Sequence, residues 1–94
     1  VVAFDEHSAE PHHIPLKYKS GRRVLLVDMG ARFMGYCSDL TRVFIKDRIP
    51  LILKVYNIVK SAQNRAIRKV RPGVKIADID SEARSYIDSK GYGR

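Results

Sequence analysis

Two aspartates eleven residues apart are the residues best suited to chemistry in this chain. Asp28 follows the apolar run 24–27, where burying an unpartnered carboxylate would be costly, and Asp39 lies further along the chain. A carboxylate in such a place needs a cation, backbone donors in the following turn, or a metal ion. Divalent ions take carboxylate oxygens readily, so the two residues are candidate metal ligands.

Two predicted strands would carry these aspartates. Residues 23–29 are one strand candidate, whose run 24–27 is apolar on both faces and therefore predicts burial on both, and residues 36–45 are rich in strand-favouring types. Together they predict a hairpin whose turn falls near residues 33–34. If Asp28 pairs with Asp39, the Cβ atoms lie about 4.5–5.5 Å apart on one face, and a shared divalent ion would neutralise the repulsion between the carboxylates.

Spacing alone leaves a second interpretation open. Asp28 would then cap the turn that follows it, and Asp39 would form an ion pair with Arg42 or Arg32. Carboxylates in structural networks can be as strongly perturbed as those in functional sites. The two aspartates by themselves do not distinguish a metal site from such a network.

Strands followed by helices predict an α+β fold, with an antiparallel sheet that carries two helices on one face. Apolar side chains recur at helical spacing after Pro50, a residue tolerated in the first turn of a helix. Pro72-Gly73 ends that pattern, and Gly91 suits the position just past the end of a second helix. The predicted elements are strands between about 1 and 45, with a polar loop at 5–15 and a turn at 17–22, and helices at about 50–70 and 76–90.

Composition limits the setting and the partners. The chain has one cysteine, Cys37, and no apolar run of the roughly 18 residues that a membrane span needs, so we expect a cytoplasmic protein without a membrane partner. The formal net charge is +8, but the basic residues are spread along the chain with few aromatic residues among them, which argues against nucleic acid. The chain opens in the apolar run 1–4 rather than with Met, as an excised segment would.

The residues around the two aspartates resemble the creatinase-fold, or pita-bread, metallopeptidases. The matching segments are 24–31 and 35–44, in which two glycines, the pair Thr41-Arg42 and both aspartates agree together. Residues 11–15 are similar to the family's substrate-site histidine segment, in a context closer to Xaa-Pro aminopeptidases and Xaa-Pro dipeptidases than to methionine aminopeptidases. The resemblance covers nearly the whole chain, so we expect residues 1–94 to be the amino-terminal half of such a catalytic domain.

The resemblance implies a role for each candidate residue. Asp28 would bind one metal ion and Asp39 would bridge two, with Mn²⁺ expected and Co²⁺ or Zn²⁺ as alternatives. His12 would be a catalytic residue that lies by the substrate and steadies the tetrahedral intermediate, and His13 a second substrate-binding residue. The implied reaction is hydrolysis, assisted by two divalent ions, of the first peptide bond of a peptide whose second residue is proline.

The family's other functional residues have no counterpart by motif among these 94 residues. They are a histidine and two glutamates, which complete the ligand set and supply the catalytic glutamate. We therefore expect the segment alone to be inactive and to need the carboxy-terminal half of the domain as its partner. Glu10 stands where the family has an apolar residue, which leaves the specificity of the site open.

Other functions remain open. A methionine aminopeptidase would use the same metal ligands. A non-catalytic creatinase-fold module would bind nucleic acid or another macromolecule through its positive charge. An isolated segment would also expose the apolar surface that its partner half covers, so self-association into a homo-oligomer is a further expectation.

Overall fold

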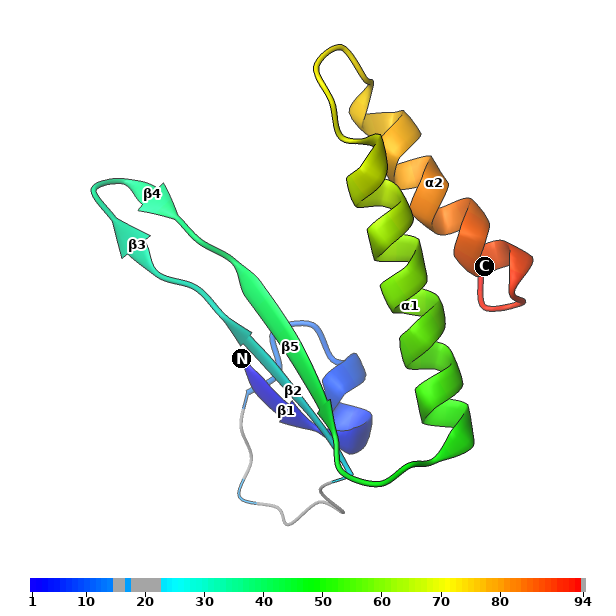
Figure 1. Ribbon diagram of the computed structural model, residues 1–94. Coiled ribbons are helices and arrows are strands. Elements are labelled where there is room, and N and C mark those ends of the chain that lie inside the picture. The colour runs from blue at the N-terminus through cyan, green and yellow to red at the C-terminus, as the bar shows by residue number, and fades with distance from the viewer. Residues whose placement is uncertain (15–16, 18–22, 94) are drawn as a thin grey trace. The chain divides into compact units, whose positions relative to one another are not determined.

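The computed structural model describes residues 1–14, 17 and 23–93, and it divides into two units, residues 1–48 and 49–94 (Figure 1). The first unit contains the strands and the second contains two helices, which confirms the α+β class. Apart from Lys17, the predicted turn at 17–22 lies outside the described residues. The placement of the helices on one face of the sheet stays a prediction.

A three-stranded antiparallel sheet forms the centre of the first unit (Figure 1). Its strands, in spatial order, are β1 (Val2–Phe4), β2 (Val24–Met29) and β5 (Leu40–Ile45). In the middle strand, Leu26 pairs with Ala3 on one side and with Val43 on the other. Ala3 is buried, whereas β2 is half-buried up to Asp28 and is not buried on both faces as predicted. A unit this small has little chain with which to cover the second face of its sheet.

The hairpin between β2 and β5 ends in a second, shorter ladder. β3 (Arg32–Phe33) pairs with β4 (Tyr36–Cys37) around the turn Met34-Gly35. Both turn residues have positive φ, 48° and 85°, as a type I′ hairpin turn requires. Glycine is favoured at the second position of this turn, so Gly35 fixes the turn one residue later than predicted.

Gly30 allows the two sides of the hairpin to approach closely between the ladders. A Cβ atom at this position would collide with the carbonyl oxygen of Ser38. The Ser38 amide donates to the Ala31 carbonyl at 2.9 Å, and the Ser38 Oγ accepts from the Ala31 amide at 3.0 Å. The strand predicted at 36–45 is therefore interrupted at Ser38 and Asp39 and forms two pieces, β4 and β5.

A short 3-10 helix, η1 (Asp5–Ala9), occupies part of the segment predicted to be a polar loop. The Asp5 Oδ1 accepts hydrogen bonds from the backbone amides of Arg23 and Val24, both at 2.9 Å. The Ser8 hydroxyl donates to the Asp5 carbonyl at 2.6 Å. These bonds tie η1 to the beginning of β2, which is why the polar residues after β1 are ordered.

The second unit is a pair of helices, α1 (Pro50–Lys69) and α2 (Ile76–Ser89), close to the predicted bounds. Pro50 is at the start of α1, and Ile58 and Ala62 are its buried residues. Gly91 follows α2 with a φ of 80°, and its amide donates to the Asp88 carbonyl at 2.9 Å. Glycine adopts this left-handed conformation at little cost, so the predicted helix end is confirmed.

Glu82 connects the two helices through ion pairs. From α2 it accepts hydrogen bonds from Arg65 Nε and Lys69 Nζ of α1, both at 2.7 Å, and its side chain is 18% exposed. The Arg65 guanidinium also lies over the ring of Tyr86, 4.9 Å from its centroid. These contacts supplement the small apolar contact between the helices.

Candidate metal and substrate site

Asp28 is held in place through both its backbone and its side chain. Its amide donates to the Val1 carbonyl at 2.8 Å, and its own carbonyl accepts from the Val1 ammonium at 2.6 Å. Its Oδ1 accepts a hydrogen bond from the Thr41 hydroxyl at 2.8 Å. The backbone that carries the carboxylate is therefore fixed, and the carboxylate itself has one neutral hydrogen-bond donor. No cation forms an ion pair with it within the described part of the chain.

The predicted register between the aspartates is wrong by two residues. Asp28 pairs with Thr41, not with Asp39, and Met29 pairs with Leu40. The turn at 34–35 causes this difference, because moving a turn by one residue moves the register by two. Such a shift keeps the alternation of faces, so the error changes the cross-strand partner without moving Asp28 to the other face.

Asp39 lies diagonally from Asp28 across the hairpin. It precedes β5 by one residue and lies beside Gly30, where an added Cβ atom would be 3.9 Å from the Asp39 Cα. Diagonal neighbours in an antiparallel pair lie roughly 7–8 Å apart, farther than directly opposite residues. An ion placed between the two side chains is compatible with that spacing.

The alternative contacts for the two aspartates, a turn cap by Asp28 and an arginine ion pair with Asp39, are not observed among the residues described. Neither Arg32 nor Arg42 forms an ion pair with Asp39 there, and the Arg42 guanidinium donates instead to the Thr41 carbonyl at 2.8 Å. The turn after Asp28 uses the Ser38 hydroxyl, not the Asp28 carboxylate, for the Ala31 amide. The donor set of two carboxylates and a supporting hydroxyl fits a hard or borderline divalent ion.

His12 and His13 differ in their surroundings. His12 is exposed and has a φ of 59°, a left-handed conformation that is uncommon for a residue with a Cβ atom. His13 has a side chain only 7% exposed, and its Nδ1 lies 2.7 Å from Glu10 Oε2. The substrate roles of both residues stay predictions, and the contact with Glu10 occupies the Nδ1 atom of His13.

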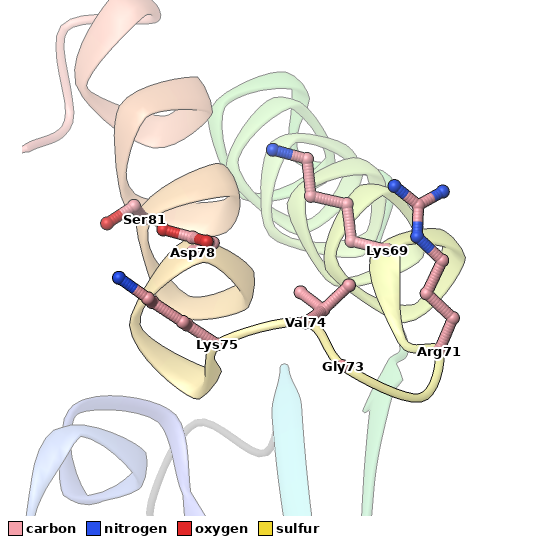
Figure 2. A pocket seen from close by; sticks show the side chains of 7 residues that line it. All are labelled: Lys69, Arg71, Gly73, Val74, Lys75, Asp78 and Ser81. Carbon is pink, nitrogen blue, oxygen red and sulfur yellow. The ribbon is translucent and has the colours of Figure 1, made fainter.

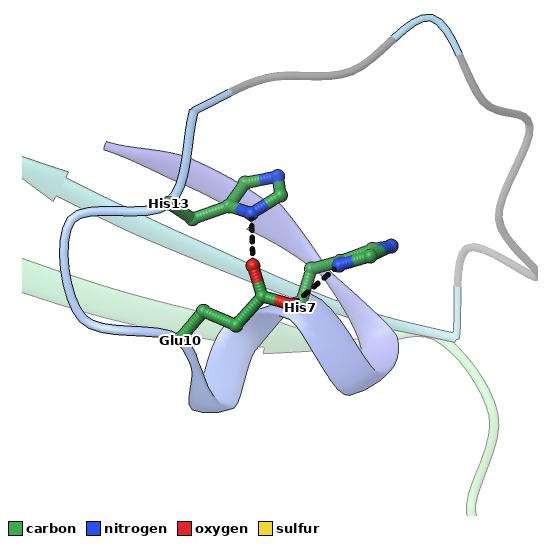
Figure 3. A group of neighbouring side chains, drawn as sticks. All are labelled: His7, Glu10 and His13. Atoms are coloured by element: carbon green, nitrogen blue, oxygen red, sulfur yellow. Dashed lines mark hydrogen bonds and ion pairs between the residues drawn. The ribbon is translucent and has the colours of Figure 1, made fainter.

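A third group, His7, Glu10 and His13, was missed by the sequence reasoning. The Glu10 carboxylate bridges the Nδ1 atoms of the two imidazoles, with His7 Nδ1 2.9 Å from Oε1, and the two rings stack on each other with 4.8 Å between their centroids (Figure 3). The hydrogen bond to Glu10 raises the pKa of His7, and the bonds from His13 and then His7 lower the pKa of Glu10. The spacing His-x₂-Glu-x₂-His is the signal that could have identified this cluster.

A cavity of about 470 Å³ lies in the second unit, around the turn between α1 and α2 (Figure 2). Its polar lining includes Lys69, Arg71, Lys75 and Asp78. Lys69 is already paired with Glu82, and Asp78 adds a negative charge to the lining, so the cavity is not a purely cationic site. None of the predicted site residues lines this cavity.

Of the helices that the structure describes, neither is long and apolar enough to cross a membrane.

Comparison with protein families gives a match over the whole chain. Residues 1–94 match the model described as Metallopeptidase family M24. Proteins of similar sequence include uncharacterized peptidases of Staphylococcus aureus strains USA300 and NCTC 8325. Each is 42% identical over 97 residues, and the match covers 99% of this chain and 27% of the relative.

Solved structures show the same fold. A recombinant prolidase from Thermococcus sibiricus matches with a TM-score of 0.92 and 40% identity, over 99% of this chain and 26% of that one. An X-Pro aminopeptidase from Thermotoga maritima MSB8 matches with a TM-score of 0.70 and 39% identity, over 74% of this chain and 20% of that one. The predicted pita-bread fold is thereby confirmed. This chain spans a fifth to about a quarter of the length of the relatives it matches.

Proposed function

Because this chain belongs to metallopeptidase family M24, we propose that it is part of an exopeptidase that cleaves an amino-terminal Xaa-Pro peptide bond. Two structural relatives, described as a prolidase and an X-Pro aminopeptidase, support this substrate class. The observation that carries the proposal is the diagonal placement of Asp28 and Asp39, two carboxylates that no cation neutralises in the described structure.

Asp28 and Asp39 are the residues that would hold the metal. Two divalent ions are proposed, Mn²⁺ first and Co²⁺ or Zn²⁺ as alternatives, because carboxylate-rich ligation favours the harder ion. When bound, such ions polarise a carbonyl and lower the pKa of a water molecule. Thr41 contributes by donating to Asp28 Oδ1, which fixes the orientation of the carboxylate and leaves Oδ2 for the metal.

His12 is proposed to contact the peptide. It is exposed and has a left-handed backbone conformation, whereas the neighbouring His13 is held by Glu10. A neutral imidazole can donate a hydrogen bond to a developing oxyanion, or a protonated one can stabilise its charge. This residue is thus a candidate for steadying the tetrahedral intermediate.

Two carboxylates are too few to fix a metal ion against solvent. We therefore propose that the 94-residue chain is inactive by itself and that further ligands, of the His and Glu types found in the family, complete the site. A chimera provides these ligands: residues 1–94 replace the matching quarter of the Thermococcus sibiricus prolidase, whose fold they share.

The chimera tests the proposed substrate class. With Mn²⁺ we expect it to hydrolyse Ala-Pro and Ala-Pro-Ala, and D28N and D39N each to abolish the activity. Ala-Ala and Met-Ala-Ser are matched control peptides without proline. Cleavage of Met-Ala-Ser in preference to the proline peptides would identify a methionine aminopeptidase instead. A folded chimera that binds Mn²⁺ but cleaves none of these peptides would contradict the proposal.

A further inference from the structure

The cluster of His7, Glu10 and His13 places three metal-binding side chains around one point (Figure 3). One ligand atom from each residue can be chosen so that all three lie within 4.8 Å of one another. The Nδ1 atoms of the two histidines lie 2.9 and 2.7 Å from different oxygens of the same carboxylate. It is the one group of three such residues found in the part of the chain that the structure describes.

These distances are close to those of a metal site. With bonds of about 2.0–2.2 Å, the donor atoms of a tetrahedral Zn²⁺ site lie roughly 3.4 Å apart. The two N···O separations in the cluster, 2.9 and 2.7 Å, are shorter than this, and no pair of the chosen ligand atoms is more than 4.8 Å apart, so side-chain rotations that even out these distances would admit an ion. Two imidazoles and a carboxylate are also a known ligand set for zinc, with a fourth position left for water.

The backbone supplies a frame for this cluster. His7 lies in η1, which Asp5 fastens to the beginning of β2 through the amides of Arg23 and Val24. Glu10 follows η1, and its amide donates to the His7 carbonyl at 3.1 Å. The His13 side chain is 7% exposed, so one of the three ligands is already withdrawn from solvent.

We propose that His7, Glu10 and His13 form a site for one borderline divalent metal ion, Zn²⁺ or a similar transition metal, that does not use Asp28 or Asp39. In the metal-free chain the Glu10 carboxylate takes the place of the ion and accepts hydrogen bonds from both Nδ1 atoms. Binding through Nδ1 requires each imidazole to carry its proton on Nε2, so a neutral histidine changes tautomer and a protonated one releases one proton to water. The ion would also fix the turn between Glu10 and His13, which carries His12.

The test measures Zn²⁺ binding to the 94-residue chain by isothermal titration calorimetry, in a D28N/D39N background that removes the two other carboxylates. We expect one Zn²⁺ per chain. H7Q and H13Q should each weaken binding by about tenfold or more, because each removes a ligand. H12Q is the matched control: it removes an imidazole from the same segment but not from the cluster, and it should leave the affinity unchanged.

NMR of the imidazole nitrogens identifies the ligand atoms in the same protein. Zn²⁺ should shift the Nδ1 resonances of His7 and His13 and leave those of His12 in place, and far-UV circular dichroism shows whether each variant keeps its fold. The proposal is overturned if the background chain binds no Zn²⁺, if H7Q and H13Q bind like their parent, or if H12Q weakens binding as much as they do.

Discussion

Thr41 donates a 2.8 Å hydrogen bond from its hydroxyl to Oδ1 of Asp28, from the position directly opposite on the neighbouring strand. The two residues are thirteen positions apart in sequence, and the turn at Met34-Gly35 is what brings them together. Because this bond uses one carboxylate oxygen, it determines which oxygen of Asp28 faces a metal ion. Thr41 therefore acts through Asp28 and is a positioning residue.

Replacing Thr41 by Val removes the hydroxyl but keeps the branched shape that suits a strand. In the prolidase chimera we expect T41V to raise the Kd for Mn²⁺ by about tenfold to a hundredfold, the usual effect of losing a residue that supports a ligand. T41S keeps the donor and should bind Mn²⁺ like the parent. Equal affinities for T41V and T41S would show that the hydrogen bond does not orient Asp28.

Gly30 and Gly35 should respond differently to the same substitutions. G30A places a Cβ atom against the Ser38 carbonyl and should cost about 1–3 kcal/mol of unfolding free energy. G35A meets no neighbouring atom but must keep a φ of 85°, at a cost of about 1–2 kcal/mol.

Asparagine distinguishes the two causes, because it tolerates the left-handed conformation but is larger than alanine. G35N should therefore be more stable than G35A, and G30N should be no better than G30A. Urea denaturation of the four variants measures these differences. A G30A chain as stable as its parent would mean that Gly30 and the Ser38 carbonyl do not lie in close contact.

Glu82 should contribute more to the stability of the helical unit than the exposed pair Asp80–Arg84. E82Q removes the negative charge that two cations of α1 contact at 2.7 Å, whereas D80N removes the charge of one pair within α2, and exposed pairs of that kind contribute little. We expect the Tm to fall clearly further for E82Q than for D80N in thermal unfolding. A similar Tm for both variants would show that Glu82 does not join the helices.

The contribution of Glu82 should also depend on pH. Lys69 and then Arg65 lower the pKa of Glu82 below its ordinary value of 4.5. The stabilisation is therefore present above pH 4.5 and is lost as the pH falls through the lower pKa of the folded state. The Tm difference between the parent and E82Q should shrink on acidification through this range; a difference that is constant down to pH 2–3 would contradict it.

His7 should titrate above its ordinary value because of Glu10. The hydrogen bond to that carboxylate raises the pKa of His7 above 6.5, and the charge of Glu6 adds a smaller effect in the same direction. In an NMR titration we expect E10Q to return the pKa to about the ordinary value, and E6Q to lower it only slightly. This charged pair stabilises the segment below pH 6.5 and is lost as the pH rises through the raised pKa. A His7 pKa that E10Q leaves unchanged would rule out the contact.

Much of the fold follows from local sequence signals. The helices at Pro50–Lys69 and Ile76–Ser89 were predictable because their apolar spacing and the breakers around them agree. The hairpin was also predictable from two strand-like runs separated by glycines. Its predicted register is wrong, because the predicted turn lies at 33–34, although the preference for glycine at the second turn position favours 34–35.

The sequence singles out candidate site residues where neighbours along the chain form a recognisable segment, as around Asp28 and Asp39, and their role as metal ligands stays a prediction. The contact of Asp28 with Thr41 depends on the register and was therefore missed. The cluster of His7, Glu10 and His13 was missed for another reason. It requires η1 and the following turn to bend the chain back on itself, and a segment predicted to be a loop gives no expectation of which side chains meet.

The joint use of Asp28 and Asp39 as metal ligands is tested most directly by crystallography of the chimera with Mn²⁺, using the anomalous scattering of the metal. We expect an anomalous peak between the two side chains, about 2.0–2.3 Å from a carboxylate oxygen of each. In D39N this peak should weaken or disappear while the fold is unchanged. A fully occupied Mn²⁺ peak that contacts neither aspartate, or that persists unaltered in D39N, would contradict the proposed metal site.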